Sequence, residues 1–238
     1  MKRTKACLLA IWAAVAAMTL AACDHDDSYR YDFSYVVPTA LVTVKPDTAG
    51  GPCLLQLDDS TALQPVNMPQ SPFGDKEVRA LASFEYVNRP LHGQLPGVRI
   101  YWIDSILTKP TAPNLGADND SAYGDEPIEI VNSWETVAED GYLTLRFRTR
   151  WTPGRTHRVN LVHRTDSAAR PWLLRLYHDA GGGAAAGEVA DGIVAFRLGD
   201  GFNRPDSTIE IELQWKSYSG MKSHTFKYRP RKPTATTH

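Results

Sequence analysis

Cysteine is scarce in this sequence, with three residues in a chain of 238, at positions 7, 23 and 53. Cys7 and Cys23 fall at an N-terminal export signal, so Cys53 stands alone in the rest of the chain. A lone cysteine excludes an internal disulfide framework, and the fold must therefore be held by its apolar core. We interpret Cys53, which precedes two leucines, as a small buried apolar residue.

An excess of charge of one sign is also missing. The chain has 26 basic and 27 acidic side chains, a formal charge of −1. Removal of residues 1–22, which hold three basic and no acidic side chains, makes this balance more negative. Nucleic-acid-binding domains usually carry a basic surface, so the composition predicts that nucleic acid is not a partner.

The N-terminus lacks a hydrophobic run long enough to span a membrane. Its apolar run, residues 6–20, has 15 positions, whereas a transmembrane helix needs about 20. The run follows Lys2, Arg3 and Lys5 and ends in small residues, a pattern typical of a secretory signal peptide. We therefore assign residues 1–22 to such a signal.

The signal ends in Leu20-Ala21-Ala22-Cys23, which has the pattern of a bacterial lipobox. We predict cleavage between Ala22 and Cys23 and lipid attachment to the Cys23 thiol, since ordinary cleavage after Ala22 leaves this cysteine unexplained. Residues 23–31 form an acidic tether, which serves either as a spacer or as a signal for surface export. The expected location is the outer membrane, with the body facing the outside or the periplasm.

The body of the chain reads as strands without a helix of convincing length, so we expect an all-β fold. Residues 32–109 contain five short strands and predict an OB-like barrel. In the last of these strands Val98, Ile100 and Trp102 alternate and are expected on one face. The five predicted strands are 34–44, 53–57, 61–63, 77–87 and 98–107.

Residues 110–126 are rich in Pro, Gly and Asp, so we interpret them as a linker. Residues 127–229 then predict a seven-stranded antiparallel β-sandwich, and 230–238 a disordered tail. Strand 142–151 carries outward arginines and strand 208–215 outward glutamates, which would pair if the two strands were neighbours. The predicted strands are 128–134, 142–151, 156–163, 171–178, 191–198, 208–215 and 223–228.

No pattern of catalytic or metal-binding residues emerges, so we expect neither an enzyme nor a cofactor nor a metal site. His157, His163 and His178 lie near Asp179, but their spacing does not match common zinc motifs, and we interpret them as structural. A carboxylate pair for hydrolysis remains open as an alternative, because Asp and Glu are plentiful and no spacing singles out a pair.

Four aromatic residues of the predicted barrel, Phe84, Tyr86, Tyr101 and Trp102, could stack against a ligand. The alternative is that these side chains fill the barrel interior.

Seven segments, taken in their order and spacing, carry a resemblance to a known family: CDHDD at 23–27, LQLDDSTALQP at 55–65, IDSILTK at 103–109, DEPIEI at 125–130, YLTLRF at 142–147, HRVNLV at 157–162 and GIVAFRL at 192–198. Through them the chain from residue 20 to residue 230 resembles the NigD-like lipoproteins of Bacteroidota. That family has an N-terminal OB-like domain and a C-terminal β-sandwich, and its name comes from a bacteriocin gene cluster, which implies an immunity or accessory role. The resemblance implies no catalytic residues.

Together these observations predict an envelope lipoprotein that binds an envelope or extracellular protein or a glycan without catalysing a reaction. Bacteriocin immunity or a related accessory role is one alternative, and a hydrolase with an unrecognised carboxylate site is another.

Overall fold

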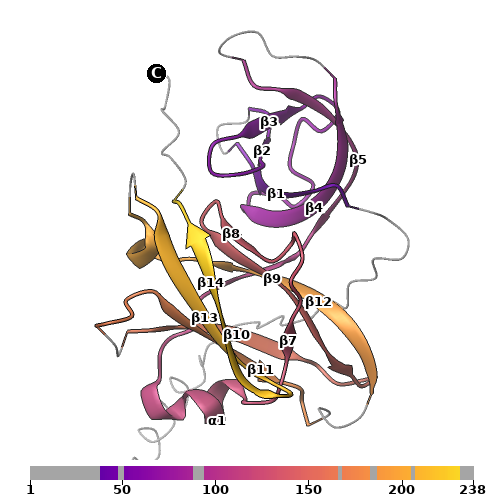
Figure 1. The fold of residues 1–238 in the computed structure, drawn as a ribbon. Helices are drawn as coiled ribbons and strands as arrows, with labels where there is room; N and C mark the ends of the chain where they lie inside the picture. Colours follow the sequence, from indigo (N-terminus) through magenta and orange to yellow (C-terminus); the bar gives the residue numbers. More distant parts are fainter. Residues whose placement is uncertain are drawn as a thin grey trace, which may run out of the picture.

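The computed structural model describes residues 38–47, 51–87, 94–165, 168–182, 187–204 and 207–230. The predicted signal, Ala22 and Cys23 at its cleavage site, the acidic tether and residues 231–238 lie outside the described residues. Within this part of the chain two β-domains stack end to end, with a barrel above a sandwich (Figure 1). None of the helices in the described ranges has the length and apolarity needed to cross a bilayer.

The N-terminal domain is the predicted five-stranded barrel, closed in the order β1-β2-β3-β5-β4. Only the β3–β5 pair is parallel. Short apolar side chains such as Val42, Leu55 and Ala80 fill the interior completely buried, which suits a barrel of this small diameter. The strands are β1 (Ala40–Lys45), β2 (Leu54–Gln56), β3 (Ala62–Pro65), β4 (Val78–Tyr86) and β5 (Gly97–Ser105).

A β-bulge changes the side-chain phase of β5. The β4–β5 register shifts between Ser83 and Phe84, so that Ser83 faces Trp102 while Phe84 faces Ile100. A bulge inserts one extra residue and reverses the alternation beyond it. Val98 and Ile100 therefore point into the barrel, whereas Trp102 points out of it. The expectation that these three residues share a face was wrong for Trp102.

The C-terminal domain is the predicted β-sandwich. Its first sheet has the strand order β10-β11-β13-β14, with β11 and β13 parallel. The second has the order β6-β12-β9-β7, and β8 also pairs with β9. The strands are β6 (Leu107–Pro110), β7 (Glu129–Ile130), β8 (Val137–Glu139), β9 (Tyr142–Trp151), β10 (Arg158–Arg164), β11 (Leu173–Asp179), β12 (Glu188–Arg197), β13 (Ile209–Ser217) and β14 (Gly220–Tyr228).

Within its described residues the sandwich thus has nine strands rather than the seven expected, and it is not wholly antiparallel. β8 has three residues, too few for alternation to reveal it. β6 follows β5 after a single residue and pairs in parallel with β12. Residues 107–109, which we expected in the barrel domain, are therefore part of the sandwich.

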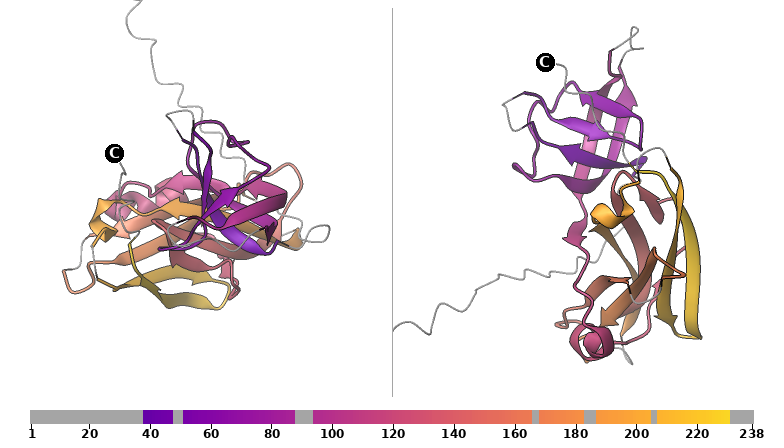
Figure 2. Two further views of the ribbon diagram at one scale, coloured as in Figure 1. Left: turned by 90° about the horizontal axis from the view of Figure 1, so that it is seen from above. Right: turned by 90° about the vertical axis from the view of Figure 1, so that its left-hand side faces the viewer.

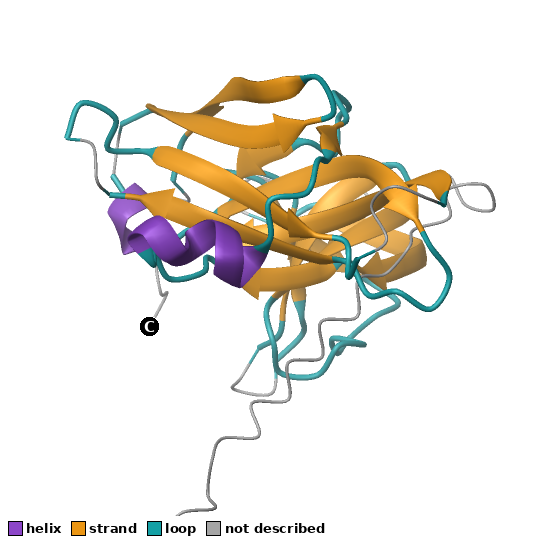
Figure 3. Cartoon of the chain, turned by 90° about the horizontal axis from the view of Figure 1, so that it is seen from below, coloured by secondary structure: helices purple, strands orange, loops and turns teal. Residues whose placement is uncertain are grey.

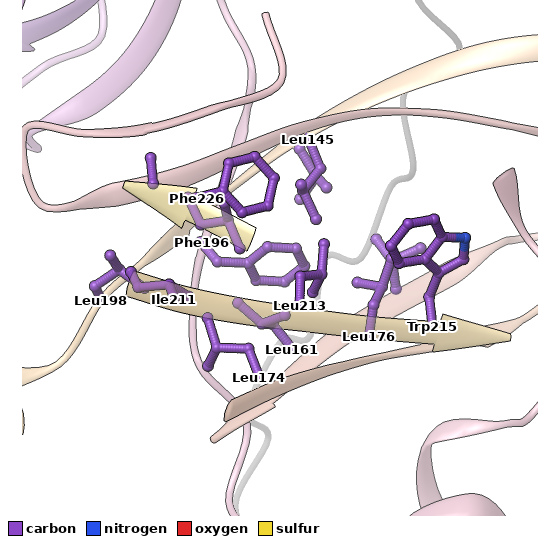
Figure 4. Packing of buried hydrophobic residues seen from close by; sticks show 14 of the residues in the cluster. Leu145, Leu161, Leu174, Leu176, Phe196, Leu198, Ile211, Leu213, Trp215 and Phe226 are labelled. Carbon is purple, nitrogen blue, oxygen red and sulfur yellow. The ribbon is translucent and has the colours of Figure 1, made fainter. Parts of the chain in front are cut away.

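Apolar residues at alternate positions of β9 and of β13 point into the sandwich core. Leu145 from one sheet meets Ile211 and Leu213 from the other, with Phe196 fully buried between them (Figure 4). Burial of one such side chain contributes about 1.5–3 kcal/mol. This shared interior fixes which face of each strand is turned inward.

Residues 111–126, most of the predicted linker, follow β6 and belong to the sandwich domain rather than separating the two domains. Ala112 forms a parallel bridge with Val162 of β10. The short helices η1 (Gly116–Asp118) and α1 (Asn119–Tyr123) follow and lie beside the sandwich strands (Figure 3). This Pro- and Gly-rich segment therefore runs along the β10 edge of the sheet.

Candidate functional site

The barrel rests on the outer face of the five-stranded sheet, at one end of the sandwich (Figure 2). The contact, here called the joint, has a small apolar centre to which both domains contribute. Trp102 is partly buried against this cluster. Its buried members are Leu41, Leu81, Ile106, Tyr142, Ile193 and Ala195.

A buried arginine lies beside this apolar cluster. The Arg79 side chain is completely buried; its Nη1 donates to Thr43 Oγ1 at 2.9 Å and its Nη2 to Glu139 Oε1 at 2.6 Å. Its guanidinium carbon lies 5.7 Å from the Tyr142 ring centroid. Burial raises the pKa of Glu139, although the charge of Arg79 counteracts this shift. The bond between Arg79 of β4 and Glu139 of β8 ties the two domains together.

A tight hairpin turn presents Glu139 and Tyr142 to the barrel. Asp140 and Gly141, which join β8 to β9, have φ of 49° and 85°. Positive φ at both central residues is the type I′ geometry that Asp-Gly favours. The buried Asp140 also donates its N–H to Asp59 Oδ1 of the barrel at 2.9 Å. The sequence signal for this hairpin is therefore the Asp-Gly pair, which our prediction did not use.

A cleft of about 380 Å³ opens at the margin of the joint. On one wall the Tyr142 hydroxyl donates to Glu77 Oε1 at 2.8 Å and accepts from Arg197 Nη2 at 3.3 Å. Burial, and next the charge of Glu77, raise the pKa of Tyr142 to about 12, so its hydroxyl remains a donor at physiological pH. The lining residues are Glu77, Asp140, Gly141, Tyr142, Arg197, Leu198, Gly199, Asp200, Asn203, Tyr228 and Pro230.

Three polar side chains of this lining are Arg197 at the end of β12, Asp200 in the short helix η2 (Asp200–Phe202) and Asn203 directly after η2. Arg197 Nη2 donates to the Glu77 carbonyl and to the Tyr142 hydroxyl, and its guanidinium carbon lies 5.6 Å from the Tyr142 ring centroid. Among the described residues, the Asp200 and Asn203 side chains have no hydrogen-bond partner. The cleft therefore offers the Arg197 cation, the Asp200 carboxylate and the Asn203 amide to a ligand. The Glu77 and Tyr142 side chains, which also line it, are hydrogen-bonded to each other.

The cleft is less suited to two-carboxylate hydrolysis, the alternative left open by the sequence. Such chemistry needs two carboxyl groups that both reach the substrate. Asp140 is completely buried and Glu77 is engaged with Tyr142. Of the described carboxylates lining the cleft, Asp200 is the one available to a ligand.

The four predicted stacking residues do not share one surface. Phe84 and Tyr86 lie together, with ring centroids 5.7 Å apart, and Phe84 packs against the barrel core. Tyr101 is 62% exposed, and its hydrogen bond with Glu85 raises its pKa. Trp102 packs at the joint. The role of these residues in ligand stacking stays a prediction for Tyr86 and Tyr101, which are the exposed pair.

Two of the three singled-out histidines meet in the sandwich. His157 Nδ1 lies 2.9 Å from His178 Nε2, and His178 Nδ1 lies 3.2 Å from the Pro127 carbonyl. Because a carbonyl only accepts, His178 Nδ1 carries its proton, and His157 must donate to His178 Nε2. Burial, and next the neighbouring His157, lower the pKa of His178 to about 4. Burial also lowers the pKa of His157.

His163 lies apart from this pair and packs on Phe202. The described residues contain no group of three side chains able to hold a metal ion. The lowered pKa values of both residues make the His157–His178 pair a neutral contact at physiological pH.

The arginines of β9 do not pair with the glutamates of strand 208–215, as the sequence suggested they would if the strands were neighbours. β9 and β13 lie in different sheets, so Arg146 and Arg148 cannot reach the glutamates of β13. Both instead donate to Asp191 of β12, at 2.6–3.1 Å. Although burial alone would raise it, these bonds hold the pKa of Asp191 below its usual range. These three residues form an ion-pair cluster across the β9–β12 strand pair.

With this geometry in view, the comparisons with known proteins identify the family. The NigD-like N-terminal OB domain matches residues 41–106, and the NigD-like C-terminal beta sandwich domain matches residues 110–228. The chain belongs to the NigD-like family. No curated protein matches it.

Solved structures support the same architecture. A candidate toxin-related protein of Parabacteroides distasonis is 29% identical with a TM-score of 0.67, covering 80% of this chain and 92% of its own. A NigD-like immunity protein of Bacteroides caccae is 20% identical with a TM-score of 0.54, covering 80% and 93%. A candidate lipoprotein of Bacteroides fragilis is 15% identical with a TM-score of 0.50, covering 82% and 98%. At these identities the last two show the fold alone.

Proposed function

We propose that this NigD-like protein is a cell-envelope lipoprotein, anchored by lipid on Cys23, that binds a polar ligand in the cleft without catalysing a reaction. The ligand is a glycan or a segment of an envelope or extracellular protein. The observation that carries the proposal is the set of available polar groups on Arg197, Asp200 and Asn203 above the Glu77–Tyr142 contact.

The cleft suits binding for three reasons. Its volume of about 380 Å³ falls in the range of small-ligand sites, roughly 300–1,000 Å³. Its polar groups include both donors and acceptors, as a ligand with hydroxyl or amide groups requires. The network below fixes Arg197 before the ligand arrives, which reduces the entropy cost of binding.

A binding measurement with the full-length lipidated protein in detergent micelles tests the cleft. An array of bacterial envelope glycans is probed with wild type and with Arg197→Gln and Asp200→Asn. We expect both variants to lose binding at least tenfold, about 1.4 kcal/mol each. Asp118→Asn, an exposed carboxylate on η1, is the matched control and should bind like wild type.

A protein ligand is tested at the same site in living cells. A photo-crosslinking residue at position 203 should capture an envelope or extracellular protein, and the same residue at position 118 should not. Absence of both glycan binding and specific crosslinking, in protein that melts normally, would reject the cleft as a ligand site.

The anchor and its orientation are tested separately. Cys23→Ser should release the protein from the membrane fraction, because the lipid needs the thiol. Protease added to intact cells distinguishes the two faces of the outer membrane. Digestion without lysis indicates surface exposure, and protection until lysis indicates that both domains face the periplasm.

Bacteriocin immunity is the second candidate, favoured by the toxin-related relative at 29% identity. A bacteriocin gene beside the gene for this protein would support it. Deletion of the gene should then sensitise cells to that purified bacteriocin, and Arg197→Gln should fail to restore resistance. Unchanged sensitivity after deletion would remove this candidate.

A further inference from the structure

The β14 strand is a long sheet edge to which no strand of the described chain is hydrogen-bonded on the outer side, although β8 of the other sheet lies near it. It ends the sheet order β10-β11-β13-β14 and pairs with β13 along all nine residues without a bulge. Its first six residues, 220–225, are exposed. In an antiparallel pair every second residue points its N–H and C=O away from the partner, so these groups face solvent along the edge.

The other sandwich edges in the described ranges are covered or short. At the β10 edge, Ala112 N–H donates to the Leu161 carbonyl at 2.7 Å. β6, β7 and β8 have four, two and three residues. Proteins usually protect long edges by such covers, by proline or by bulges. β14 has neither proline nor bulge, so the edge is built like a site for strand addition.

Charge indicates which kind of strand would add. β14 contains Lys222, His224 and Lys227 and no acidic residue. Lys222 Nζ is held by Glu129 Oε2 at 3.0 Å, on the side that faces the other sheet. Basic side chains on an edge strand disfavour pairing with a second copy, because β14 of that copy would supply no carboxylate. An acidic strand would instead place carboxylates beside these residues.

We propose that the β14 edge binds an extended, acidic segment of another protein, which adds as a fifth strand to the four-stranded sheet. The backbone of β14 supplies the hydrogen bonds, and Lys227, which lies between the inward Phe226 and Tyr228 and therefore faces outward, selects the acidic side chains. This surface is separate from the cleft and requires no ligand there.

The test uses the full-length protein and three synthetic nine-residue peptides with capped ends. The first alternates glutamate with valine, the second has lysine in place of glutamate, and the third is the first with proline at its centre. Fluorescence anisotropy gives the dissociation constants, and amide hydrogen exchange locates the protected strand. We expect the acidic peptide to bind most tightly and to slow exchange in β14, because proline removes a ladder bond and lysine adds repulsion.

Variants sharpen the test. Lys227→Glu should weaken binding of the acidic peptide about threefold to fivefold and strengthen binding of the lysine peptide. Lys76→Glu, at an exposed barrel position with the same change of charge, is the matched control. Ser223→Pro should abolish peptide binding if the variant folds. If it does not fold, the difference in peptide affinity between Lys227→Glu and Lys76→Glu tests the proposal.

Equal affinity for the three peptides would overturn the proposal. So would the absence of saturable binding by the acidic peptide up to about 1 mM, near the limit of useful affinity. Protection outside β14, or sedimentation showing that the free protein dimerises through this edge, would also contradict it. These results are independent of the cleft variants, so either site can fail alone.

Discussion

The interiors of the two domains and the joint between them are built on different principles. The main cluster of the sandwich and that of the barrel consist of apolar side chains, 20 and nine buried residues respectively within the described ranges. The joint combines six buried residues with a buried arginine and its partner carboxylate. Apolar burial is non-directional and stabilises each fold, whereas the contacts of Arg79 have fixed geometry and define how the domains sit. The cleft depends on the second kind of contact.

Removing a core aromatic should have the largest effect. Phe196→Ala in the sandwich is expected to lower the free energy of unfolding by about 3–5 kcal/mol, because it removes a fully buried ring and leaves a cavity. Urea denaturation measures the loss. Val189→Ala, at an exposed position of the same strand, should change stability by less than about 0.5 kcal/mol.

Breaking the joint should come next. Arg79→Ala is expected to cost about 3 kcal/mol, because Glu139 then remains largely buried without its cation. The double variant Arg79→Met with Glu139→Gln should recover most of this loss, since neither of the two positions then carries a charge. Arg99→Ala, which removes an exposed arginine from β5, serves as the control. A loss in Arg79→Ala no larger than in Arg99→Ala would show that the joint contributes little.

Acid should destabilise the sandwich through its histidine pair. The folded-state pKa of His178 is about 4, below the usual value of about 6.5 in an unfolded chain. The unfolded chain therefore binds the proton more readily below pH 6.5. His178 alone should lower stability by about 2 kcal/mol between pH 7 and pH 5, and His157 acts in the same direction. Denaturation curves across this range should lose much of their pH dependence in His178→Asn.

The smallest effect is expected at the cleft wall. Tyr142→Phe removes a hydroxyl that bonds to Glu77 and Arg197 but keeps the buried ring. A loss of about 1 kcal/mol is expected for such bonds, together with weaker ligand binding because Arg197 is less fixed. Thermal denaturation and the glycan array measure the two effects. Unchanged binding would show that the network does not support the cleft.

Much of the fold was predictable because alternation reports which face of a strand is buried. β9 and β13 show this directly, with Leu145 and Leu213 inward. Alternation predicts solvent exposure for every residue on the outward face of a strand, so it fails where another domain covers that face. Arg79 alternates with the inward Val78 and Ala80, so its position indicates solvent, yet it is fully buried at the joint.

The candidate site was less predictable, because tertiary pairing assembles it from distant segments. Glu77, Tyr142 and Arg197 meet only through the joint and the register of β9 with β12. The His157–His178 contact likewise depends on the β10–β11 register, in which Val159 faces His178. Neither set of contacts can be read from the pattern of a single sequence, because both depend on which strands pair and in which register.

The central claim is that the joint holds barrel and sandwich in one arrangement and thereby shapes the cleft. A distance measurement between spin labels tests it, with Asp75→Cys on the barrel and Asp118→Cys beside the sandwich, both exposed, in a Cys53→Ala background. Pulsed electron resonance should give one narrow distance distribution, which broadens in Arg79→Ala. A broad distribution without this substitution, or one that Arg79→Ala leaves unchanged, would contradict the claim.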